Sequence, residues 1–144
     1  MTEANLKAGL KAYGAARRTQ TPVRIVVELF DAVLCAVAKA KAARLMKNYE
    51  DEFNAVCRAN QILAGLDSVV DENQPKVKPI AEILHNYYAL TVEQLHRAKQ
   101  TKGEEGESRY GSVHRQILTM REAWAWIAGV PSLLPESGKE EKSA

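Results

Sequence analysis

Aromatic residues, cysteines and an excess of charge of one sign are all scarce in this chain. Of its 144 residues, 6% are aromatic and two are cysteines, and the formal net charge is +2. A protein that binds a nucleic-acid duplex usually shows a basic stripe on one face, whereas Lys and Arg alternate with Asp and Glu here, so we predict no nucleic-acid partner. Cys35 and Cys57 lack the CxxC spacing of a zinc or redox site, and we interpret both as buried, small hydrophobic residues in a reducing compartment.

Long hydrophobic runs are also missing. No apolar stretch approaches the roughly 20 residues that span a bilayer, and lysines and glycines interrupt the apolar positions near the N-terminus. The sequence therefore predicts neither a membrane partner nor a secretory signal, and we expect a protein that stays in the cytoplasm. A chain of this size and composition, 46% hydrophobic and 26% charged, can bury a proper core as a single domain.

Apolar residues instead recur at helical spacing. The last such segment has the cleanest seam, in which apolar residues from Tyr110 to Ile127 alternate steps of three and four, the spacing of a packed bundle. Short connections between long helices favour an antiparallel arrangement. We predict an all-α, up-down, antiparallel four-helix bundle, with helices at about residues 22–47, 50–71, 79–100 and 108–128.

The two ends of the chain fit this bundle less well. Residues 1–18 are weakly amphipathic but contain two glycines, each of which costs roughly 1 kcal/mol in a helix, so we interpret them as a flexible N-terminal arm. Thr21 and Pro22 form a start signal for the first long helix, as a capping residue followed by a residue that suits the first turn. Residues 19–128 are the predicted bundle, and the prolines, serines and charges of 129–144 predict a disordered tail.

The first long helix is unusual because it is apolar almost all round. Between Ile25 and Ala38 only Glu28 and Asp31 are polar. Such a helix is either central in its fold or covered by something else. Two interpretations follow and need not conflict: the bundle and the N-terminal arm bury this helix, or a partner binds to it after displacing the arm.

Several segments, taken in order, resemble the flagellar secretion chaperone family FliS. Residues 19–31 (Thr-Gln-Thr-Pro-Val-Arg-Ile-Val-Val-Glu-Leu-Phe-Asp) are similar to the family's opening Thr-Ala-Ser-Pro, two polar residues, an apolar run and Leu-Tyr-Asp-Gly, and Tyr13 resembles its N-terminal tyrosine. Residues 59–71 resemble a pattern that ends in Leu-Asp, residues 80–88 with their downstream leucine and alanine resemble Ile-Ala-x-x-Leu…Tyr…Leu…Ala, and residues 120–124 resemble the closing Leu-Arg-x-x-Trp. The ordered set covers about residues 12–126.

This resemblance implies a cytosolic export chaperone. Members of the family wrap the disordered C-terminal segment of flagellin around a helical bundle, prevent its premature polymerisation and present it to the export gate, and the free protein's N-terminal segment folds over part of the site. By this resemblance the partners are the flagellin C-terminal segment and the flagellar export gate, the protein is a monomer or weak dimer, and it is not an enzyme and needs no cofactor. The predicted client-binding residues are Tyr13, Ile25, Val26, Leu29, Phe30, Leu34, Val37 and Tyr88, and the predicted structural residues are Thr21, Pro22 and Trp124.

Two other function classes stay open. In a generic dimerising or adaptor bundle, the apolar face of the first long helix would bury against a second copy. A metal-binding bundle enzyme is suggested by Glu82–His85 and Glu93–His96, which have the Glu-x-x-His spacing of di-iron bundles. The two pairs lie about 16 Å apart along one helix and cannot share a metal within one chain, so we predict exposed polar positions and no metal site.

Overall fold

All regular secondary structure in the described part of the chain is helical. The computed structural model describes residues 3–16, 23–70 and 78–135, with the backbone alone for 13–16. No strand occurs within these ranges, and the prediction of an all-α fold is confirmed. The helices are α1 (Glu3–Ala16), α2 (Val23–Leu45), α3 (Tyr49–Ser68), α4 (Lys78–Gln100) and α5 (Gly103–Ala128).

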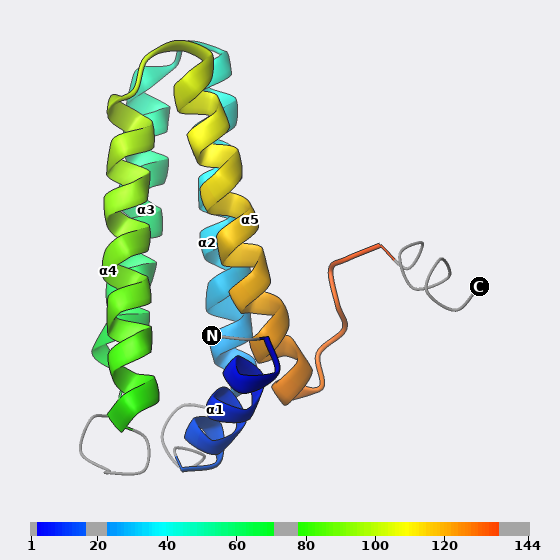
Figure 1. Cartoon of the computed structure of the whole chain (residues 1–144). Coiled ribbons are helices and arrows are strands. Elements are labelled where there is room, and N and C mark those ends of the chain that lie inside the picture. The colour runs from blue at the N-terminus through cyan, green and yellow to red at the C-terminus, as the bar shows by residue number, and fades with distance from the viewer. Residues whose placement is uncertain (1–2, 17–22, 71–77, 136–144) are drawn as a thin grey trace.

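Four long helices, α2 to α5, lie side by side and antiparallel, and the shorter α1 lies at one end of them (Figure 1). α2 packs against α3 and α5, and α4 packs against the same two helices. We call the end that carries α1 the α1 end. The opposite end, where α2 turns into α3 and α4 into α5, is the turn end.

One hydrophobic core joins all five helices. Each helix contributes at least one fully or almost fully buried side chain, and full burial of a Leu, Ile or Val side chain is worth about 1.5–3 kcal/mol. The core therefore holds α1 to the bundle as well as the long helices to one another. Representative members, one per helix in chain order, are Leu10, Val27, Leu63, Leu84 and Ile117.

The turn between α2 and α3 is tightly hydrogen-bonded. Lys47 has the left-handed backbone conformation, with φ 57°. Its N–H donates to the carbonyl of Arg44 at 2.9 Å, and the N–H of Asn48 donates to that of Ala43 at 2.8 Å, which is the Schellman pattern of a helix C-terminus. The Asn48 side chain then caps α3 by accepting from the N–H of Asp51 at 3.1 Å.

α5 begins earlier than the sequence pattern indicates. It starts at Gly103 rather than near Ser108, and its first turn carries Glu104 and Glu105, whose negative charge suits the positive end of the helix dipole. It ends at Ala128, and its C-cap Gly129 has φ 70°, which lets the N–H of Val130 reach the carbonyl of Ala125 at 2.9 Å.

Some predicted features fall outside the described residues. These are Thr21 and Pro22 of the predicted start signal, most of the predicted loop before α4, and residues 136–144 of the predicted tail. Within residues 1–18, the predicted N-terminal arm, 3–16 form a helix. Among the helices that the structure describes, none is both long and apolar enough to cross a membrane.

Candidate functional site

α2 is covered by its neighbours in the bundle. α3 and α5 pack along it, and most of its large apolar side chains are buried. Of the two interpretations of its apolar composition, burial within the bundle therefore holds for most of its large side chains. A helix between two neighbours needs apolar residues over more than a single stripe, and this requirement explains its composition.

The predicted client-binding residues consequently lie in two different environments. Ile25 is 44% exposed and Leu29 is half-buried, whereas the side chain of Tyr13 is outside the described residues. The other five positions belong to the core of the free chain, and their role in client binding stays a prediction. The Phe30 and Tyr88 rings, for example, lie with their centroids 6.3 Å apart between α2 and α4. The five buried residues are Val26, Phe30, Leu34, Val37 and Tyr88.

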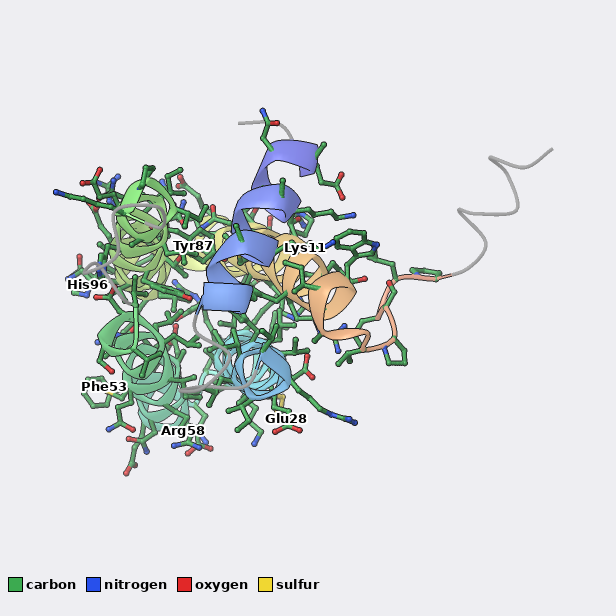
Figure 2. The ribbon with its side chains drawn as sticks, turned by 90° about the horizontal axis from the view of Figure 1, so that it is seen from below. Lys11, Glu28, Phe53, Arg58, Tyr87 and His96 are labelled. Carbon is green, nitrogen blue, oxygen red and sulfur yellow. The ribbon has the colours of Figure 1, made fainter. Side chains whose placement is uncertain are left out.

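α1 packs mainly on α5 and also on α4. The view from the α1 end shows α1 on the side of the bundle formed by α4 and α5 (Figure 2). Leu10 is fully buried, and a Cβ at Gly9 would come within 3.1 Å of the Ile80 side chain, so the glycine permits close approach. The Lys7 ammonium lies 5.3 Å from the centroid of the exposed Trp126 ring. The arm thus covers part of α4 and α5 rather than the long α2 surface.

A groove with a small-residue floor runs between α2 and α3. Its volume is about 710 Å³, within the usual range of ligand-binding clefts. It lies on the side of the bundle away from α1, where Glu28 and Arg58 point outward (Figure 2). Its walls carry both charges and amides. The lining residues are Ala32, Cys35, Ala36, Lys39, Ala42, Ala43, Met46, Asn48, Asp51, Asn54, Ala55 and Arg58.

The sequence pattern of large apolar side chains does not indicate this groove, because its floor is made of small residues. The signal is present: Cys35, Lys39, Ala42 and Met46 follow steps of four and three, which places them on one helix face. Cys35 is exposed in the groove and Cys57 is half-buried, so the interpretation of both cysteines as buried is corrected. Small residues leave room for the side chains of another helix.

A buried polar cluster fixes the turn end of the bundle. Tyr110 donates to the Glu52 carboxylate at 2.6 Å, and Arg44 lies 3.4 Å from the same carboxylate. The Arg44 guanidinium also donates to the carbonyl of Ala98 at 2.6 Å and to that of Thr101. Burial, together with the neighbouring Glu52, raises the pKa of Tyr110 well above its usual range, so the phenol stays a donor. These bonds join α2, α3, α5 and the C-terminal end of α4.

A second polar cluster fixes the α1 end. Arg121, with 3% of its side chain exposed, donates to Asp31 at 2.7 Å and to Glu122 at 2.9 Å. It also donates to the carbonyl of Pro131 at 3.0 Å, and Glu122 accepts from Ser132. The hydrogen bond to Asp31 raises the pKa of Arg121, against the opposing effect of burial. Trp124, predicted as structural, is buried in the same helix, α5.

The Glu-x-x-His pairs of α4 are not brought together. His85 is half-buried and its Nδ1 contacts the Asp67 carboxylate of α3, which corrects its predicted exposure. Glu93 forms an ion pair with Arg97 at 2.8 Å, and His96 points outward (Figure 2). Within the described residues, no group of three or more His, Cys, Asp or Glu side chains is placed to hold a metal ion.

Comparison with known proteins gives one clear match. The model of the family described as "Flagellar protein FliS" matches residues 7–130. The matched region begins within α1 and extends to the residue after the α5 C-cap. It includes most of α1, the α2–α3 groove, the polar cluster at the turn end and, at the α1 end, Asp31, Arg121 and Glu122. No curated protein matches the chain.

Proposed function

Because the chain belongs to the FliS family of flagellar export chaperones, we propose that it binds the disordered C-terminal segment of flagellin, prevents its premature polymerisation and delivers it to the export apparatus. The match to the family model over residues 7–130 is the observation that carries this proposal. The proposed place of action is the cytoplasm, with the export gate as second partner and a monomer or weak dimer as the working form.

The two surfaces described above suit a client that folds as it binds. A disordered segment can wrap a long surface at moderate affinity because it pays its ordering entropy on binding. One stretch of client would lie as an amphipathic helix in the α2–α3 groove, with its large side chains over Ala36 and Ala42. A second stretch would occupy the seat of α1 on the other side of the bundle. Ile25 and Leu29, accessible on α2, would serve as further contacts, and the buried predicted residues would take part only where the bundle opens.

The groove is tested by placing a charge in it. Ala42→Glu puts a carboxylate among the alanines at an exposed position, and we expect the affinity for a flagellin C-terminal peptide, measured by isothermal titration calorimetry, to fall at least about tenfold. Cys35→Glu is expected to act in the same way. Ala64→Glu, an exposed alanine of α3 outside the lining of the groove, is the matched control.

Unchanged affinity in both groove variants would move the client away from α2 and α3. No binding of the peptide by the unsubstituted chain would refute the flagellin assignment itself. These two results can be told apart, because the unsubstituted chain still binds the peptide in the first case and does not bind it in the second.

The seat of α1 gives a second prediction. Leu10→Ser removes the fully buried side chain that anchors α1 to the bundle. Because α1 then docks less tightly on the surface that the client would occupy, a larger fraction of chains is open to the client. We expect association with the flagellin peptide, followed by stopped-flow fluorescence, to become roughly five- to thirtyfold faster, in line with the loss of about 1–2 kcal/mol of docking energy. Lys11→Ser, at the adjacent exposed position, should leave the rate unchanged. Slower association in Leu10→Ser would mean that α1 helps to hold the client.

A further inference from the structure

A cluster of large apolar side chains is exposed at the turn end, far from α1. Leu45 is 56% exposed, Met46 80%, Tyr49 63% and Phe53 49%. All four lie within nine residues around the α2–α3 turn, whose hydrogen bonds fix its shape. We call these four residues the corner patch. Apolar side chains that gather on a surface in this way mark an interaction site more often than scattered ones do.

Cations surround the corner patch. Leu45 and Tyr49 line a groove of about 430 Å³ together with Lys47, Lys99 and Lys102, and the Lys99 ammonium lies 4.6 Å from the centroid of the Phe53 ring. The acidic groups nearby are partly engaged. Glu52 pairs with Arg44 and Asp51 with Asn48, so Glu107 is the remaining carboxylate among the residues that line this groove. The groove therefore presents apolar surface with a net positive rim.

Lys47 stands where the backbone favours glycine. Its left-handed conformation costs an ordinary L-residue about 1–2 kcal/mol, and glycine avoids this cost at the C-terminal turn of a helix. A lysine at this position instead places an ammonium group beside Leu45 and Tyr49 in the groove. Strain retained at a surface turn points to a use for the side chain.

We propose that the corner patch is a second protein-docking surface, which takes an acidic, amphipathic peptide segment of a partner protein with Leu or aromatic side chains flanked by Asp and Glu. Apolar side chains of the segment would contact Leu45, Tyr49 and Phe53, and its carboxylates would face Lys47, Lys99 and Lys102. The complementary charge of the rim favours an acidic occupant. A concave groove fits a peptide better than a bilayer surface.

This surface is separate from the proposed client site. Met46, a member of the corner patch, also lines the α2–α3 groove. Lys47, Tyr49 and Lys99 line the groove of about 430 Å³ beside the corner patch and do not line the α2–α3 groove. Substitutions at these three positions therefore report on the corner patch, whether or not flagellin is the client.

The experiment is a selection of short peptides from a random phage-displayed library on the full chain, followed by fluorescence-anisotropy titration of the enriched peptides. We expect the enriched sequences to combine Asp or Glu with Leu, Phe or Trp. Tyr49→Ser should weaken their binding about tenfold, as loss of an aromatic anchor does. Lys47→Gly should weaken it about threefold, the usual weight of one exposed ion pair, while the melting temperature of the chain stays equal or rises.

Controls are available at similar exposed positions. Lys78→Gln removes one positive charge at the α1 end, and Leu90→Ser removes an exposed apolar side chain from α4, and neither should change the affinity. Absence of enrichment, enrichment of basic or uncharged peptides, or equal binding to the parent and the Tyr49→Ser variant would overturn the proposal. Binding of the chain to phosphatidylglycerol vesicles that is lost in Tyr49→Ser would replace it with a membrane surface.

Discussion

Replacing Gly106 with alanine is expected to lower the free energy of unfolding by roughly 1–2 kcal/mol, the balance between an overpacking cost of about 2–3 kcal/mol in a tight site and a gain in helix propensity. A Cβ at this position would lie 2.2 Å from the Thr101 carbonyl oxygen and 2.5 Å from the Arg44 Cζ. Neither group can move away cheaply, because the Arg44 guanidinium donates to that same oxygen and to the Ala98 carbonyl. The better helix propensity of alanine, worth about 1 kcal/mol, offsets only part of this cost.

Gly65→Ala is the matched control for this substitution. Gly65 also lies within a helix, α3, but nothing comes within 4 Å of the Cβ that alanine would add there. We expect this variant to be more stable than the parent by about 0.5–1 kcal/mol, since only the propensity changes. Urea denaturation followed by circular dichroism measures both. Equal stabilisation of the two variants would show that the contact at Gly106 is relieved without cost.

Gly106 also shows why the start of α5 could not be predicted from the local sequence. The segment Gly-Glu-Glu-Gly-Glu at 103–107 has the composition of a loop, since each glycine disfavours a helix. The competing influence comes from Arg44, about sixty residues earlier, which needs a neighbour without a side chain in order to reach the end of α4. The local pattern contains no trace of a contact between such distant segments.

The same limit applies to α1 and α2. Periodicity correctly predicted that α2 is apolar over a wide arc, but it could not decide whether a partner or the bundle covers that arc. Packing of α2 between α3 and α5 answers this for Phe30, Leu34 and Val37. Gly9 counted against a helix in the arm, and yet it lets α1 approach Ile80. What the sequence did reveal was the fold class, because the long 3.6-residue periodicities of α3, α4 and α5 are local properties.

Removal of the Arg121 guanidinium is the second large effect that we expect. Arg121→Met keeps the length and apolar stem of the side chain but leaves Asp31 and Glu122 without their cation and the Pro131 carbonyl without its donor. Breaking a buried pair by removing one partner costs about 3–5 kcal/mol. Because Asp31 is partly exposed and water can solvate it, we expect a smaller loss, roughly 2–3 kcal/mol. Arg115→Met, an exposed arginine of the same helix that donates only to Ser112 among the contacts described for it, should stay within about 0.5 kcal/mol of the parent.

The ion pair between Asp31 and Arg121 also joins α2 to α5 at the end of the bundle where α1 packs. Asp31 and Arg121 come from two segments that resemble the family, one near the start of α2 and the other near the end of α5, and their bond sets the register of these helices at the α1 end. Trp126, one turn further along α5, is part of the seat of α1. Arg121→Met should therefore loosen both the seat and the segment after Gly129, so that amide hydrogen exchange quickens at Leu10 and at Leu133, whose N–H points to Glu122. Exchange that quickens at Leu133 alone would show that the seat of α1 does not depend on the register of α5.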